Sequence, residues 1–147
     1  MKILIKPYNK TLDYVLPKYA TDGSAGADLN AILAEPLTIN PLQRILVPTN
    51  LCIELPQSFE AQIRPRSGLA LKNGITVLNT PGTIDSDYRG EIKIILINLS
   101  NEPFVINHKD RIAQLIISPI VKSNFILSLD ELNTTDRNHS GFGSSGK

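Results

Sequence analysis

Short runs of isoleucine, leucine and valine, separated by proline, glycine and asparagine, are the feature that most limits how this chain can fold. Ten prolines and nine glycines are spread along 147 residues, and no helical apolar stripe lasts more than two turns. Such runs are typical of an all-β sandwich or barrel. The expected strands are Ile3–Ile5, Leu37–Ile39, Arg44–Val47, Leu51–Leu55, Phe59–Ile63, Ile92–Ile97 and Phe104–Ile106.

Two further segments have local signals for structure. Ser67–Lys72 is expected to form one short helix, with Ser67 as its cap and Gly74 as its terminator. Asp110–Ile117 is ambiguous, because its apolar residues suit one helical face while the following Ser118-Pro119 suits the end of a strand.

Length and charge restrict the class of protein. A chain of 147 residues is expected to form one domain with its own core. Fifteen basic and 14 acidic residues give a net charge of +1, which argues against a nucleic-acid binder that works by bulk electrostatics. No run approaches the roughly 20 apolar residues of a membrane helix, and Ile3–Ile5 is too short for a signal-peptide core. We therefore expect a cytoplasmic protein that does not bind membranes.

The single cysteine, Cys52, excludes an intrachain disulfide and fits a reducing compartment. A catalytic thiol is one interpretation. Its apolar neighbours and the lack of a nearby histidine favour a small buried hydrophobe instead.

Two glycine-containing turns carry groups suited to anions and metals. In the first, Arg66, the Ser67 hydroxyl and the Gly68 amide would form a compact anion site, although a simple strand-to-helix turn fits equally. The second, Ala20–Leu29, contains Asp28, which is either a local turn residue or an oxygen partner for hydrated magnesium.

Asn79–Glu91 reads as a strand, a turn and a returning strand, which predicts a β-hairpin. Asn79 supplies an amide, Asp85 a carboxylate and Tyr88 a flat ring. Together these groups could bind a planar polar ring.

From Thr134 onward the chain is polar and glycine-rich and cannot bury a core, so we expect a mobile tail. Gly141–Lys147 matches most of a Walker A loop but lacks its magnesium-binding hydroxyl and following helix. Arg137 and the serines of this tail could instead close over phosphates, and Phe142 could stack on a base.

In chain order, these segments resemble the five motifs of the trimeric dUTP pyrophosphatase (dUTPase) family. The matching segments are Ala20–Leu29, Pro65–Ala70, Asn79–Glu91, Asp110–Ile116 and Arg137–Gly146. The resemblance implies an all-β, jelly-roll-like (β-clip) subunit with one short helix, a strand at Asp110–Ile117 and a homotrimer. It also implies a β domain at residues 1–133 and a flexible arm at 134–147 that closes over a neighbouring active site.

The family further implies hydrolysis of dUTP to dUMP and pyrophosphate, which limits uracil incorporation into DNA and supplies dUMP for thymidylate synthesis. Asp85 would be the general base, and Tyr88 would pack on the deoxyribose and exclude a 2′-hydroxyl. Asp28 would contact Mg²⁺ through water. The uracil edge would be bound by Asn79, Gly82, Thr83, Ile84 and Lys93. The phosphates would be bound by Arg66, Ser67, Gly68 and Gln114. From the arm, Phe142 would stack on uracil, and the phosphates would be contacted by Arg137, Gly143, Ser144 and Ser145.

Two rival functions fit parts of this pattern, namely a dCTP deaminase of the same fold and a nucleotide-sensing protein without turnover. The Tyr88 segment and the arm argue against the deaminase, whereas Asp85 and Arg137 argue for turnover. The chain also departs from the family pattern at five positions: Thr83, Lys109, Asn138, Ser140 and Ser145.

Overall fold

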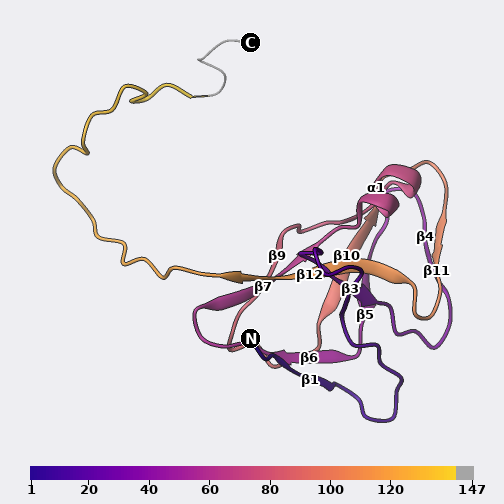
Figure 1. The fold of residues 1–147 in the computed structure, drawn as a ribbon. Helices are drawn as coiled ribbons and strands as arrows, with labels where there is room; N and C mark the ends of the chain where they lie inside the picture. The colour runs from indigo at the N-terminus through magenta and orange to yellow at the C-terminus, as the bar shows by residue number, and fades with distance from the viewer. Residues whose placement is uncertain (142–147) are drawn as a thin grey trace.

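The computed structural model describes residues 1–141 and shows an all-β chain with one short helix (Figure 1). The strands are β1 (Leu4–Pro7), β2 (Lys18–Tyr19), β3 (Ala27–Asn30), β4 (Leu37–Ile39), β5 (Arg44–Pro48), β6 (Leu51–Glu54), β7 (Phe59–Arg64), β8 (Ile75–Val77), β9 (Gly82–Ile84), β10 (Lys93–Asn98), β11 (Phe104–Ile106) and β12 (Arg111–Pro119). The predicted fold class is confirmed, and each of the seven predicted runs contains a strand within one or two residues of its expected bounds.

The strands form one larger sheet, one smaller sheet and two strand pairs. The larger sheet has the order β2-β3-β12-β7-β9 and the smaller has the order β5-β10-β8. The two pairs are β1-β6 and β11-β4. The ambiguous segment at Asp110–Ile117 is a strand, because β12 pairs with both β3 and β7 along its length.

The predicted β-hairpin at Asn79–Glu91 is wrong. Gly82 of β9 lies opposite Ile63, and Ile84 lies opposite Ala61, so β9 is an edge strand of the larger sheet. The strand that follows, β10, already has β5 on one side and β8 on the other. Because both edges of β10 are occupied, the segment 79–91 leaves one sheet and enters the other instead of folding back on itself.

The helix α1 (Ser67–Asn73) confirms the predicted element, with one difference at its start. Arg66 is the N-cap residue in extended conformation, and no side chain caps the first turn, so the prediction of Ser67 as cap is wrong. Gly74 ends the helix as predicted, with a left-handed φ of 65° and its N–H directed to Ala70 O.

The core lies between the inner faces of the sheets and is almost purely aliphatic. Its most buried side chains include Leu29, Ile39, Val47, Leu51, Ile94, Leu96 and Ile106. Cys52 is 3% exposed beside this core, which confirms its interpretation as a buried residue. Burial raises the pKa of the Cys52 thiol, which disfavours the nucleophilic thiolate.

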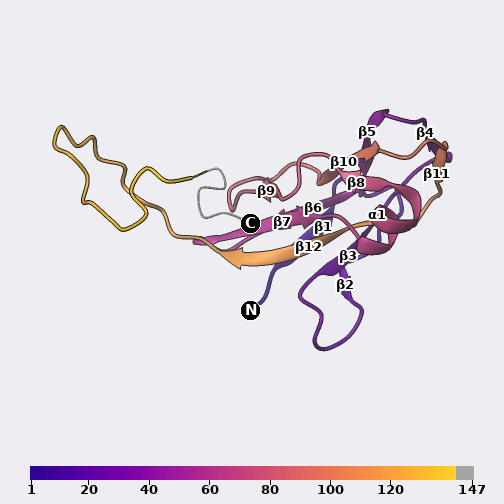
Figure 2. The same ribbon diagram turned by 90° about the horizontal axis from the view of Figure 1, so that it is seen from above.

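Beyond Pro119 the described residues form no helix or strand, and Figures 1 and 2 show this segment running away from the sheets. Val121, Phe125 and Leu129 on it are each more than 90% exposed. Within residues 1–141, α1 is the only helix, and it is far too short to cross a membrane.

Candidate active site

A pocket beside the segment 79–91 gathers seven residues that were expected to hold a base and sugar, all of them within the described part of the chain. Those residues are Asn79, Gly82, Thr83, Ile84, Asp85, Tyr88 and Lys93. Ile63, Val77 and Ile94 add apolar lining from three different strands. We call this cavity the ring pocket, because apolar walls with a few polar groups suit a flat heterocycle.

The shape of the ring pocket depends on close packing around Gly82. A Cβ atom added at Gly82 would lie 3.1 Å from Asn79 Nδ2 and 3.5 Å from Ile63 Cβ. A side chain at this position would require the Asn79 amide to move by a few tenths of an ångström, so glycine allows the close approach seen here. Leu78 N–H donates to Ile95 O over 2.9 Å, which ties the start of the segment to β10.

A tight turn brings Asp85 and Tyr88 to the same side of the pocket. Tyr88 N–H donates to Asp85 O over 3.1 Å, and the Tyr88 hydroxyl donates to Glu91 O over 3.0 Å. The ring lies so close to Gly90 that a Cβ there would collide with it. Gly90 is therefore required for this position of the ring.

A second pocket, which we call the anion pocket, lies where β3, β12 and the start of α1 meet. It is lined by Ala20, Ser24, Ala25, Gly26, Asp28, Arg66, Ser67, Gly68, Arg111 and Gln114. The Asp28 carboxylate pairs with two guanidinium groups, Arg66 Nε at 3.1 Å from Oδ1 and Arg111 Nη1 at 3.1 Å from Oδ2. Arg66 also donates to Arg111 O over 3.2 Å. Two arginines and the amides of 67 and 68 make this pocket suited to a polyanion.

Gln114 connects the anion pocket to the strand beneath it. Its Nε2 donates to Pro65 O over 2.9 Å, and its Oε1 lies against Gly26, where a Cβ would collide with it. Gln114 therefore holds the loop before α1 and the 20–26 turn against β12. Its expected contact with phosphate remains a prediction.

The anion pocket offers few protein ligands for a metal ion, so it fits an ion that is coordinated mainly by the oxygens of a bound phosphate ligand. Among residues 1–141, no three His, Cys, Asp or Glu side chains cluster as a metal-binding group. Asp28 is the one carboxylate lining the pocket. A carboxylate has about four acceptor positions, and the two arginines use two of them. Asp28 can therefore accept a hydrogen bond from metal-bound water, as magnesium sites commonly require.

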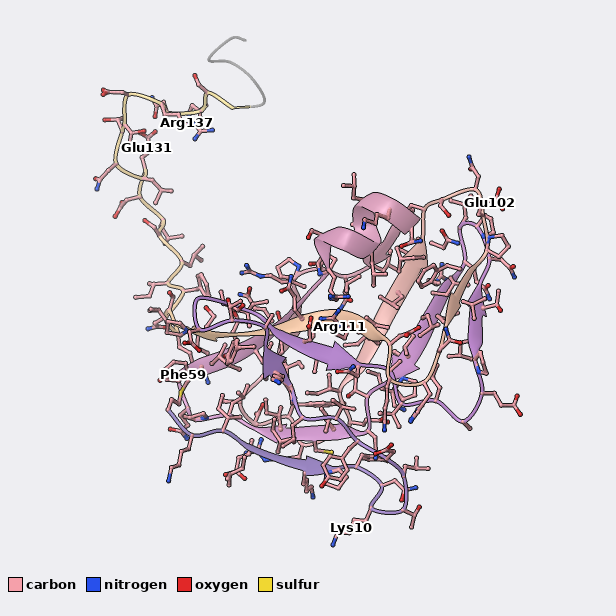
Figure 3. The ribbon with its side chains drawn as sticks, turned by 45° about the vertical axis from the view of Figure 1, so that its right-hand side comes forward. Lys10, Phe59, Glu102, Arg111, Glu131 and Arg137 are labelled. Carbon is pink, nitrogen blue, oxygen red and sulfur yellow. The ribbon has the colours of Figure 1, made fainter. Side chains whose placement is uncertain are left out.

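The two pockets share no lining residue. Figure 3 shows Arg111 within the folded part of the chain, at the start of β12. Arg137 lies on the extended tail, away from both sheets. Arg137 Nε contacts Ser140 O at 3.0 Å within a local turn. Phe142, Gly143, Ser144 and Ser145 lie outside the described residues.

Arg111 and Glu91 are two site residues that the sequence analysis did not single out. Arg111 begins β12 and pairs with Asp28, 83 positions away, so no local pattern signals it. Glu91 lines the ring pocket with a side chain that is 9% exposed.

Two departures from the expected motifs have a backbone explanation. Lys109 and Asn138 stand where glycine is expected, and both adopt left-handed backbone, with φ values of 65° and 45°. Asparagine tolerates this conformation. Lys109 is held there by its N–H bond to Ala31 O at 2.7 Å and by an ion pair with Asp13 at 2.6 Å.

A family model described as dUTPase matches residues 13–146 of the chain. The deoxyuridine 5'-triphosphate nucleotidohydrolase of Treponema denticola is 58% identical over 132 residues, which cover 90% of this chain and 91% of the relative. The protein of the same name from Wolbachia pipientis wMel is 57% identical over 150 residues, covering 100% of this chain and 97% of the relative.

Solved phage structures share the fold. The dUTPase of Staphylococcus bacteriophage 80alpha with dUPNHPP has a TM-score of 0.87 at 22% identity, covering 99% of both chains. A mutant dUTPase of phage phi11 of S. aureus, described with a structural Mg(II) ion, has a TM-score of 0.79 at 18% identity. That match covers 90% of this chain and 100% of the phage chain.

Proposed function

The chain belongs to the dUTPase family, and we propose that it hydrolyses dUTP to dUMP and pyrophosphate, limiting uracil incorporation into DNA and supplying dUMP for thymidylate synthesis. The observation that carries this proposal is the ring pocket, because seven residues expected to bind uracil and deoxyribose line one cavity.

The ring pocket selects uracil by its hydrogen-bonding edge. The Asn79 amide and the backbone groups of 82–84 and 93 face the edge of the base. Cytosine exchanges donor and acceptor at two positions of that edge, N3 and the group on C4, so it would leave buried polar groups unpaired. The backbone of this pocket would also leave no room for the methyl group of thymine.

Tyr88 selects the sugar. Its ring is fixed over Gly90 and by the bond from its hydroxyl to Glu91 O. A deoxyribose packs against such a flat face, whereas the 2′-hydroxyl of a ribose would clash with it or lose its hydration.

The triphosphate lies in the anion pocket. Arg66, the Ser67 hydroxyl and the Gly68 amide bind the phosphate chain, with Gln114 beside them. Arg111, which already faces Asp28, adds a second positive charge to this surface.

Magnesium is the ion that this arrangement suits, and Asp28 would hold it through bound water. When bound to the phosphates, the ion neutralises charge on the departing pyrophosphate.

Asp85 acts as the general base at the exposed rim of the ring pocket. It takes a proton from water as the water oxygen bonds to the α-phosphorus. The bond from that phosphorus to the bridging oxygen breaks, and the electron pair leaves with pyrophosphate. The proton then passes from Asp85 to solvent, so atoms and charge balance.

We further propose a homotrimer in which each site combines groups from different chains. One chain presents a ring pocket and an anion pocket with no residue in common. The arm at 134–147 would close over a neighbour's site, with Arg137 on the terminal phosphates, Phe142 on uracil, and Gly143, Ser144 and Ser145 around the phosphates.

Deleting the arm is expected to abolish turnover and leave a trimer in light scattering. A monomer would contradict this arrangement.

Hydrolysis in ¹⁸O-labelled water tests the reaction. Attack on the α-phosphorus places the label in dUMP, which mass spectrometry detects. Label found in pyrophosphate would overturn the proposed mechanism, and an absence of dUMP would overturn the proposed function.

A further inference from the structure

We propose that Glu91 is a positioning residue that fixes the wall of the ring pocket, an inference that rests on the proposed function of that pocket. Its carboxylate makes two contacts. Oε1 accepts a hydrogen bond from Asn50 N–H over 2.9 Å, and Oε2 lies 3.4 Å from Lys93 Nζ. The Glu91 side chain is 9% exposed and Asn50 is 1% exposed, so the contact with Asn50 is shielded from bulk water, whereas the Lys93 side chain is 43% exposed.

The turn that carries Asp85 and Tyr88 needs an anchor. Among the described residues, the hydrogen bonds made by residues 86–90 all stay within the segment 85–91. Firm attachment to the rest of the fold begins at Glu91 and continues at Ile92, whose N–H donates to Leu51 O over 2.8 Å. Ile92 O also accepts from the Thr49 hydroxyl over 2.7 Å. Residues 49–51 are therefore the surface to which the end of the turn is attached.

That surface is itself rigid. Asn50 is 1% exposed and has a left-handed φ of 56°. Its side-chain amide donates to Asn9 O at 3.0 Å and Asp13 O at 2.8 Å. Its side-chain oxygen, Oδ1, accepts a hydrogen bond from Asn9 N–H at 2.8 Å. The Asn50 backbone N–H is thus held in place for a charged acceptor, and the Glu91 carboxylate is that acceptor.

Glu91 acts on the pocket through its neighbours on both sides. Its backbone carbonyl accepts the Tyr88 hydroxyl, and its carboxylate pairs with the Lys93 ammonium at the pocket wall. A shift of residue 91 would therefore move two parts of the pocket: the Tyr88 ring, which contacts the sugar, and Lys93 at the start of β10, which faces the base. Glu91 would act by placing these two residues and not by touching the reacting phosphorus, so it is a positioning residue.

Two substitutions separate the two contacts. Glu91→Gln keeps an oxygen that can accept from Asn50 N–H but loses the charge beside Lys93. Glu91→Ala loses both. Glu54→Ala is the matched control, because Glu54 is exposed on β6 and does not line the pocket. The full chain is assayed with Mg²⁺ for turnover of dUTP and UTP, and for binding of dUMP by equilibrium dialysis.

Glu91→Ala is expected to weaken dUMP binding and raise KM for dUTP about tenfold, the effect of one shielded charged hydrogen bond. Its kcat should change much less, and its preference for dUTP over UTP should fall. Glu91→Gln should restore dUMP affinity to within about threefold of wild type. The control should match wild type.

Unchanged dUMP affinity and sugar preference in Glu91→Ala would overturn the proposal, even if the variant unfolds at a lower temperature. A merely structural role would lower the unfolding temperature and leave those two quantities intact well below it. Wild-type protein that neither hydrolyses dUTP nor binds dUMP would contradict the proposed function as well.

Discussion

The guanidinium of Arg66 lies 3.1 Å from the carboxylate of Asp28, although 38 positions separate the two residues in the sequence. This pair joins β3 to the start of α1. Arg111 occupies the other oxygen of the same carboxylate. The free chain therefore holds in place, with an internal anion, the arginine that we propose for phosphate binding.

Asp28→Asn is expected to lower kcat/KM for dUTP by about tenfold or more. The amide keeps the shape of the side chain but leaves two arginines facing each other without a counter-charge. Steady-state pyrophosphate release measures the effect. Asp22 is exposed in the turn before β3, and Asp22→Asn should stay within about twofold of wild type. Equal activity of both variants would show that the Asp28 carboxylate is dispensable.

Asp85→Asn is expected to reduce kcat by roughly 10²–10⁴-fold, because the amide cannot take the proton of the attacking water. KM should change little, since the pocket keeps its shape. Single-turnover kinetics separate binding from chemistry. Asp87→Asn is the control, because Asp87 is exposed on the same turn and does not line the ring pocket. Near-normal turnover of Asp85→Asn would assign the base to another group.

Gly90→Ala is expected to reduce the preference for dUTP over UTP by about tenfold, because the added methyl group would displace the Tyr88 ring. Competition between the two nucleotides measures this ratio. Gly23→Ala makes the same chemical change where nothing lies within 4 Å of the new atom. If both variants kept the wild-type preference, sugar selection would not depend on the position of the ring.

How far the sequence predicted the site depends on the distance over which each interaction acts. The seven residues of the ring pocket that were expected to bind base and sugar lie in one segment and the strand after it. Local pattern and the family resemblance could therefore identify them as candidates. The partner of β9 could not be found that way. Whether residues 82–84 pair with β10 or with β7 depends on which sheet edges are free, and that is a property of the assembled fold.

The same reasoning explains what was missed in the anion pocket. Asp28 was predicted as a candidate magnesium partner, but its pairing with Arg111 spans 83 positions and has no local signal. Lys109 departs from the motif because glycine is expected at this position, and a lysine does not by itself signal a left-handed backbone. Only the structure shows that the lysine adopts this backbone while its ammonium contacts Asp13.

The Asp13–Lys109 pair predicts a small acid-dependent loss of stability. The bond from Lys109, together with the Tyr14 N–H, holds the pKa of Asp13 below its usual value of 3.8. A lowered folded-state pKa gives stability that is present above the unfolded pKa and is lost as the pH falls through the folded one. The difference in urea midpoint between wild type and Asp13→Asn should be constant near neutral pH and shrink below pH 3.8. A difference that grows on acidification would contradict this assignment.

Initial rates of pyrophosphate release from dUTP, UTP, dCTP and dTTP, each at the same concentration with Mg²⁺, test the central claim most directly. The ring pocket predicts rapid release from dUTP and rates at least about 100-fold lower for the other three nucleotides. Comparable rates for any of the three, or no pyrophosphate from dUTP, would contradict the account.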